Sequence, residues 1–138
     1  MKTLFMRIIW VAMVSFITTL SNAQTFRCTS IEFCDDVSTS KQQQIKVEIL
    51  GSKLECEKFD SDIKVTVSYN HDGEFKKDIA VFVKNRNIFS EDIYEYKIKN
   101  HLGAIQFEKT LGFITRAKMK HYYRDKLEYT ATFERELF

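Results

Sequence analysis

The chain contains no proline, and its 138 residues include only four glycines, three cysteines and one tryptophan. An excess of one charge is also lacking: apart from Lys2 and Arg7, the chain carries 19 basic and 19 acidic residues. This balance leaves no basic excess to attract nucleic acid, so no nucleic-acid partner is expected. Beyond residue 23 no apolar run is long enough to cross a bilayer, and the length suits one domain rather than a multi-domain enzyme.

The first 23 residues have the pattern of a secretory signal. Lys2 and Arg7 precede an apolar run over residues 8–20 that only Ser and Thr interrupt, and the triplet 21–23 has small residues at both ends. This pattern predicts cleavage before Gln24 and export to a periplasm or the cell exterior as a soluble protein. A membrane anchor is the alternative, although the run is shorter than the ~20 residues that a span needs. The expected organisation is a signal peptide over 1–23 and one β domain over 24–138.

The three cysteines, Cys28, Cys34 and Cys56, lie within the expected mature chain. Export permits a disulfide, and an odd count leaves at least one thiol free or paired to another chain. Because Cys28 and Cys34 are six residues apart on one expected strand, a bridge would join Cys56 to Cys28 or Cys34. Three buried, reduced thiols are the alternative. No cysteine or histidine spacing typical of zinc sites is present.

Alternation with a period of two dominates the rest of the chain and predicts antiparallel strands. In the first expected hairpin, Ile45, Val47 and Ile49 alternate with polar residues and the chain turns at Gly51 and Ser52. This pairing buries Cys56. The stretch 35–44 is polar and is expected to be a loop.

The second expected hairpin turns at a three-residue loop over 71–73. That loop places Tyr69 opposite Phe75 and Val65 opposite Ile79, and so keeps one face apolar. A two-residue turn at Asp72–Gly73 would pair apolar with polar positions, and the alternation therefore disfavours it.

The third expected hairpin turns at 124–126. It aligns Tyr123 with Leu127, His121 with Tyr129 and Ala117 with Phe133, and on its other face it sets Arg116 opposite Glu134. A helix is the rival interpretation of this region. A further pairing joins a strand over 94–98 to one over 105–107 through a turn at 100–103.

About eight or nine strands follow, each with one apolar and one polar face. This pattern predicts an all-β antiparallel meander that closes as a small barrel or packs as a two-sheet sandwich. The expected strand number and order resemble those of calycin-type barrels, although none of their sequence motifs is present. The resemblance therefore implies a fold and no ligand site.

No nucleophile elbow, phosphate loop, dinucleotide fingerprint or zinc-protease motif occurs, so no catalytic residue, cofactor or metal is expected. His121 is the one histidine predicted on an apolar face. It forms a candidate ligand-binding group with three tyrosines, namely Tyr96, Tyr123 and Tyr129. A core histidine bonded to a tyrosine hydroxyl is the structural alternative. His71 and His101 are expected in solvated loops.

These features favour an exported, non-enzymatic binding module for a small hydrophobic ligand or a protein partner. Two other classes stay open. One is a structural or assembly subunit joined through an edge strand or the odd cysteine. The other is an enzyme or inhibitor whose site lies near His121.

Overall fold

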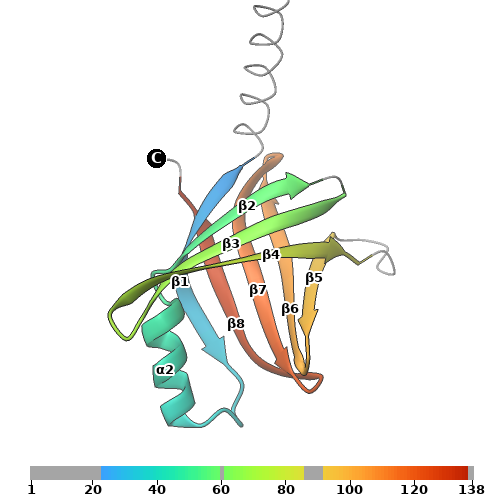
Figure 1. Cartoon of the computed structure of the whole chain (residues 1–138). Coiled ribbons are helices and arrows are strands. Elements are labelled where there is room, and N and C mark those ends of the chain that lie inside the picture. Colours follow the sequence, from blue (N-terminus) through green and yellow to red (C-terminus); the bar gives the residue numbers. More distant parts are fainter. Residues whose placement is uncertain (1–22, 60, 86–91, 137–138) are drawn as a thin grey trace, which may run out of the picture.

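The computed structural model describes residues 23–59, 61–85 and 92–136, and in it eight antiparallel strands form one closed barrel (Figure 1). Each strand pairs with the next in chain order, and β1 pairs with β8 to close the ring. The strands are β1 (Gln24–Phe33), β2 (Lys53–Phe59), β3 (Asp62–His71), β4 (Glu74–Lys84), β5 (Ile93–Ile98), β6 (His101–Thr110), β7 (Phe113–Tyr123) and β8 (Lys126–Arg135). The predicted all-β meander is confirmed as a barrel, and the sandwich alternative is excluded.

One helix, α2 (Thr39–Ile49), replaces the first strand of the first expected hairpin and most of the loop expected over 35–44. Ile45 and Ile49 pack against the core, whereas Val47 is 76% exposed. Residues four apart share one helix face, so the two isoleucines satisfied a strand pattern and a helix pattern equally. Ser38 begins the helix because its side-chain oxygen accepts a hydrogen bond from the Lys41 amide at 3.3 Å. Gly51, with φ +81°, follows its end as a helix-terminating glycine rather than as a hairpin turn.

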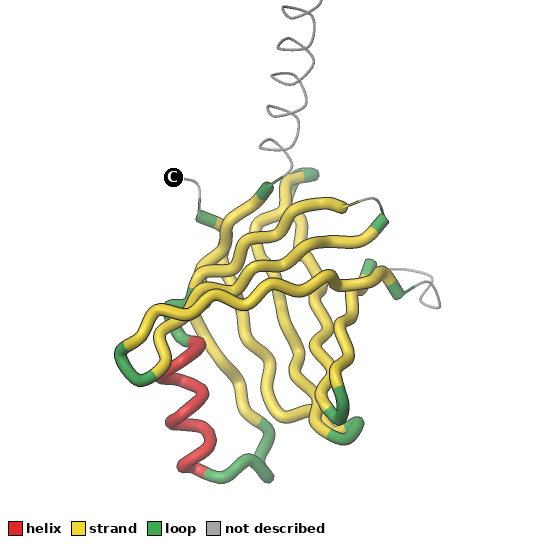
Figure 2. The backbone as a smooth tube through the Cα atoms, in the orientation of Figure 1, coloured by secondary structure: helices red, strands yellow, loops and turns green. Residues whose placement is uncertain are grey.

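The helix lies where β1 and β2 separate. These strands pair only over 24–27 and 53–56, after which β1 continues against β8 alone. Figure 2 shows α2 beside the free half of β1, close to the β3–β4 hairpin, and α2 contacts both β1 and β3. It therefore covers the barrel wall at one end.

The second hairpin has a different register from the expected one. Its turn has two residues, Asp72 and Gly73, with φ of 51° and 80°, which is the type I′ geometry that Asp-Gly favours. Ala80, rather than Ile79, therefore opposes buried Val65. Ile79 points outward and is 60% exposed. The preference of Asp72–Gly73 for a two-residue turn therefore outweighed the burial of Ile79 and the other apolar residues on the outer face of β4.

The third hairpin is confirmed over most of its length. Ala117 opposes Phe133, His121 opposes Tyr129 and Arg116 opposes Glu134. The expected Tyr123–Leu127 pair is wrong, because the turn again has two residues with positive φ, at 124 and 125, and an irregularity follows. The β5–β6 hairpin likewise turns earlier than expected, before His101, so that Gly103 lies within β6.

The apolar core fills one end of the barrel. Inward-facing side chains from five strands have no exposed surface there, namely Phe26, Leu54, Ile105, Ala117, Ala131 and Phe133. Burial of this kind is the main favourable contribution to folding. At this end the interior is therefore packed and dry.

All three cysteines carry free thiols. Gln24 is the β1 residue opposite Cys56, and Cys28 lies four residues further along the strand, about 13 Å away at the usual rise. A disulfide requires Cα atoms within about 7 Å, so this register does not bring Cys28 and Cys56 into bonding range. The expected bond from Cys56 to Cys28 or Cys34 is not formed in the structure.

Candidate functional site

The interior changes from apolar to polar along the barrel. On β6 and β7 the inward-facing pairs run in order from Phe107–Ala117 through Ile105–Met119 to Gly103–His121 and His101–Tyr123. Since alternate residues of a strand face the same side, His101, His121 and Tyr123 share the inner face with the buried residues of the core. The end of the barrel opposite the dry core therefore carries imidazole and phenol groups.

Two histidines and two tyrosines form one contact cluster at this end. The rings of His101 and His121 stack with centroids 5.2 Å apart, and His101 Nδ1 lies 3.2 Å from His121 Nε2. Tyr123 packs against His101 at 4.9 Å, and Tyr129 packs against His121 at 5.1 Å. The histidine pair is thus held between two phenol rings.

A β-bulge aims a carboxylate at this pair. The register passes from His121–Tyr129 to Tyr122–Leu127, so Glu128 is an extra residue on β8. Bulges commonly redirect a side chain, and here the Glu128 carboxylate is almost buried, with Oε1 3.2 Å from His121 Nδ1. Neither atom forms a hydrogen bond in the structure. Each is therefore the natural partner of the other after a small rotation.

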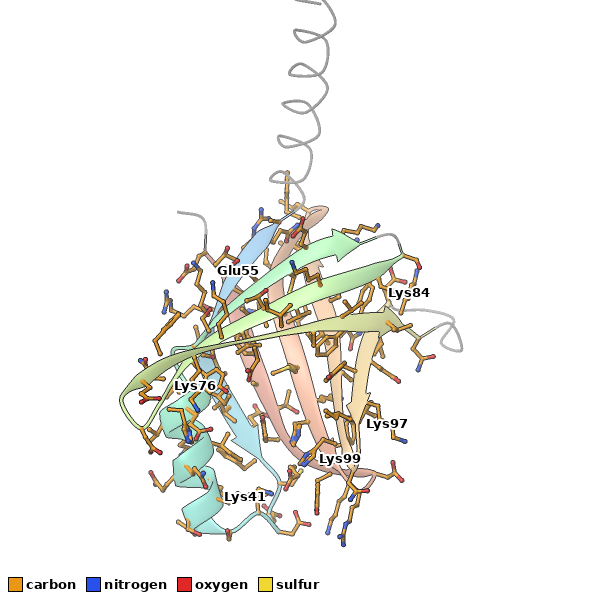
Figure 3. All side chains as sticks on the ribbon, in the orientation of Figure 1. Lys41, Glu55, Lys76, Lys84, Lys97 and Lys99 are labelled. Atoms are coloured by element: carbon orange, nitrogen blue, oxygen red, sulfur yellow. The ribbon has the colours of Figure 1, made fainter. Side chains whose placement is uncertain are left out.

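Lys41 of α2 completes the cluster. Its Nζ pairs with Glu128 Oε2 and lies 5.6 Å from the centre of the Tyr123 ring. Figure 3 shows Lys41 at the same end of the barrel as Lys99, which lies in the β5–β6 turn. The helix that sequence reasoning missed thus supplies a cation to the site.

Burial sets the protonation of the site. It lowers the pKa of His121, reinforced by His101 and Lys41 and opposed by Glu128. Burial also raises the pKa of Tyr129 to about 12. At neutral pH His121 is therefore a neutral imidazole and Tyr129 a neutral phenol.

These contacts favour one tautomer of each histidine. A carboxylate can only accept, so it favours the His121 tautomer with the proton on Nδ1, whose Nε2 then accepts from His101 Nδ1. The uncharged His101 tautomer that donates from Nδ1 has its acceptor at Nε2. The cluster therefore offers a hydrogen-bond acceptor at His101, whose ring contacts His121, which in turn contacts Glu128.

Of the four residues predicted from the sequence, the structure brings three into one cluster with His101: His121 and Tyr123 contact His101, and Tyr129 contacts His121. Tyr96 lies apart from that cluster, with its ring 5.6 Å from Phe82 and opposite Gly103 in the sheet. Sequence reasoning missed His101, Glu128 and Lys41. Extending the alternation of β6 back from Phe107 through Ile105 would have placed His101 on the inner face.

The third histidine, His71, lies outside the cluster. His71 is the last residue of β3, paired with Glu74, rather than part of the turn as expected, and its Nδ1 is 2.6 Å from Glu48 Oε1 on α2. Within residues 23–59, 61–85 and 92–136, no three His, Cys, Asp or Glu side chains are arranged to hold a metal ion. The described part of the chain also contains no helix long and apolar enough to cross a membrane.

Replacing His121 by glutamine is expected to weaken the loss of stability between pH 7 and pH 5. The pKa of His121 is lowered from 6.5 in the folded state, so the unfolded chain binds a proton that the folded chain does not, and acidification favours unfolding. Glutamine removes that proton uptake. Thermal unfolding of both proteins from pH 8 to pH 5 tests this, and equal dependence of Tm on pH would contradict it.

No protein family model matches the chain, and the search of curated proteins finds no match to it. The inferences below therefore rest on the geometry and chemistry of the described residues.

Proposed function

We propose that the protein is a non-enzymatic binding module that holds a small hydrophobic ligand at the open end of its barrel. The ligand's apolar part lies against the inner wall, and its polar group meets the histidine pair. The single observation that carries the proposal is the polar cluster at the end of the barrel opposite the dry core, beside an inner wall that stays accessible.

Half-buried side chains on the inner wall of the barrel support the presence of space for an apolar group. Val67, Ala80 and Met119 contact the buried core but are only half-buried. In a barrel filled by its own side chains, inward positions of this kind would be sealed. A ligand would complete their burial.

The short pairing between β4 and β5 supports an entry route for the ligand between these two strands. These strands pair only at Val83–Glu95 and Lys84–Tyr94, so residues 74–82 of β4 pair with β3 alone. Figure 1 shows β4 and β5 diverging toward the end that carries the histidines. The barrel is thus closed most weakly beside the proposed site.

The free acceptor on His101 suggests the ligand's polar group. In the tautomer that donates from Nδ1 to His121, His101 accepts a hydrogen bond at Nε2, so a hydroxyl or an N–H donor fits best. We therefore propose an apolar molecule with one donor group.

A ring added to the inner wall is expected to block binding, and the same ring on the outer wall is not. Ala80→Phe fills the interior, whereas Val81→Phe, one residue along the same strand, adds its ring to the outer face. The probe is N-phenyl-1-naphthylamine, an apolar fluorophore with one N–H donor. Ala80→Phe should weaken its binding about tenfold or more, the loss expected when about 1.4 kcal/mol of contact is removed.

Fluorescence titration measures this effect, and thermal unfolding of both variants checks that the barrel is intact. Equal affinities for the two variants, or no binding to the parent protein, would contradict the proposal.

We also propose export with cleavage before Gln24, on the pattern of residues 1–23. The first 22 of these residues lie outside the described part of the chain. Because β1 begins at Gln24, cleavage there would remove no part of the barrel.

A further inference from the structure

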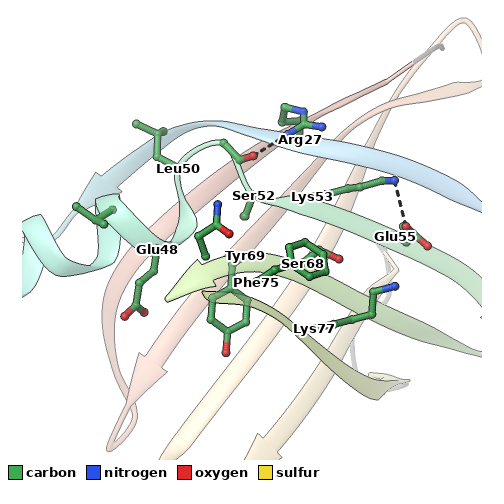
Figure 4. A pocket seen from close by; sticks show the side chains of 13 residues that line it. Arg27, Glu48, Leu50, Ser52, Lys53, Glu55, Ser68, Tyr69, Phe75 and Lys77 are labelled. Carbon is green, nitrogen blue, oxygen red and sulfur yellow. Dashed lines mark hydrogen bonds and ion pairs between the residues drawn. The ribbon is translucent and has the colours of Figure 1, made fainter. Parts of the chain in front are cut away.

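A second concave surface lies outside the barrel, between the end of α2 and the outer faces of β2, β3 and β4 (Figure 4). Its volume is about 360 Å³. The histidine cluster does not line it. We call it the outer groove, and define it by Leu50, Ser52, Ser68, Phe75 and Lys77.

Two lysines flank a buried serine on the floor of the outer groove. The register places Ser68 opposite Lys53 on one side and opposite Lys77 on the other, so the three side chains form a row across β2, β3 and β4. Directly opposed residues have Cβ atoms about 5 Å apart. Ser68 is almost fully buried beneath them.

A second buried serine carries an unused hydroxyl. Ser52 is 5% exposed, lines the groove, and its Oγ has no hydrogen-bond partner. An unpaired hydroxyl away from water costs free energy that a bound ligand atom would recover. Figure 4 shows Ser52 and Ser68 between Leu50 and Lys77.

The acidic side chains of the groove already have partners. Glu48 is 2.6 Å from His71, and Glu55 is 3.3 Å from Lys53. Arg27, at the edge, pairs with Glu136 and donates to the Gly51 carbonyl. Within the described residues the Lys77 ammonium has no ion-pair or hydrogen-bond partner. The positive charge of Lys77 is therefore left without a negative partner in the groove.

The rim of the groove is apolar. Phe75, Val47 and Leu50 line it, and all three are exposed large side chains. Grouped apolar side chains beside polar groups are typical of binding sites.

We propose that the outer groove binds a carboxylate attached to an apolar group. One carboxylate oxygen takes the Lys77 ammonium and the other accepts from the Ser52 hydroxyl, while the apolar group covers Phe75 and Leu50. A free organic acid and the C-terminal residue of a peptide share this chemistry.

The test compares 4-phenylbutyrate with its neutral amide, 4-phenylbutyramide, by NMR titration of ¹⁵N-labelled protein. The carboxylate should bind about tenfold more tightly, the preference typical of one charge-assisted contact. Its addition should shift the amide signals of Gly51, Ser68 and Asn70. Equal affinity for acid and amide, or shifts centred on Gly103 at the open end, would overturn the proposal.

Two lysine variants separate a specific contact from general charge attraction. Lys77→Met should reduce the affinity for the acid to that for the amide. Lys76→Met removes the same charge from the neighbouring residue, which lies outside the groove lining, and should leave the affinity unchanged. Equal losses in the two variants would overturn the proposal.

Ser52→Ala tests the hydroxyl. A hydroxyl that serves a ligand should, when removed, weaken binding of the acid several-fold and leave Tm unchanged or higher, because the folded protein loses an unpaired polar group. Unchanged binding, or a lower Tm, would assign the hydroxyl a structural role and overturn its part in the site.

A peptide ending in leucine, with free and amidated C-termini, distinguishes the two sources of the carboxylate. Tighter binding of the free-acid peptide than of 4-phenylbutyrate supports a protein C-terminus as the ligand. The reverse order supports a free acid. Failure of both to exceed their amides contradicts the proposal.

Discussion

Replacing Phe133 by alanine is expected to lower the free energy of unfolding by about 3–5 kcal/mol, the range measured for large aromatic residues in packed cores. Phe133 has 0% exposed surface. It faces the interior opposite Cys28 and Ala117, both buried, so the neighbouring side chains are too small to fill the space that the ring leaves. Since whole domains are stable by only about 5–15 kcal/mol, the variant should lose a large share of its stability.

Phe113→Ala is the matched control. This phenylalanine is 70% exposed at the start of β7, so its truncation should change stability by no more than about 0.5 kcal/mol. Denaturant unfolding of the three proteins measures both effects. Equal losses would show that the interior at Phe133 is not packed, and would contradict the dry core described here.

The period of two was enough to predict the barrel wall because each strand buries only one face. The pairings of His121 with Tyr129 and of Ala117 with Phe133 followed from that rule alone. The rule failed where two structures satisfy the same spacing. Ile45 and Ile49 lie on one side of a strand and equally on one side of a helix. The Ser38 side chain favours the helix, because it accepts a hydrogen bond from the amide of Lys41, three residues further along the chain.

A conflict between two local preferences caused the error in the second hairpin. Alternation favoured burying Ile79, whereas Asp72–Gly73 favoured a two-residue turn. A shift of one residue reverses every side chain of a strand, so the turn chemistry exposed all the apolar outer residues of β4. Without that shift Phe75 would not line the outer groove.

The candidate site was predictable only in part, for the same kind of reason. His121 and its tyrosines follow from strand parity. Glu128 does not, because strict alternation places it outside and only the bulge turns it toward His121. Lys41 reaches the cluster from a helix, in a polar stretch that was expected to be a loop. Functional groups held by irregular backbone are thus the ones that pattern reasoning misses.

The thiols of Cys28 and Cys56 are expected to react with a disulfide reagent at least about a hundredfold more slowly than a thiol with the ordinary pKa of 9.0, because the thiolate is the reactive form. Burial raises the pKa of Cys28 from 9.0 to about 11, and that of Cys56 to about 12. Near neutral pH each unit lowers the thiolate fraction about tenfold, and burial also excludes the reagent. Cys34, half-buried after the end of β1, should supply the one fast thiol of the native protein.

Counting thiols before and after unfolding tests this prediction together with the absence of a disulfide. Without reductant, the native protein should show one fast thiol and the denatured protein three, because no bond joins Cys56 to Cys28 or Cys34. A single thiol in the denatured protein would establish that bond, and with it a β1–β2 register different from the one that pairs Gln24 with Cys56 or a different path for the chain after β1. Cys34→Ser assigns the fast thiol: the native variant should show none, and a fast thiol that survives would mean that water reaches Cys28 or Cys56 inside the barrel.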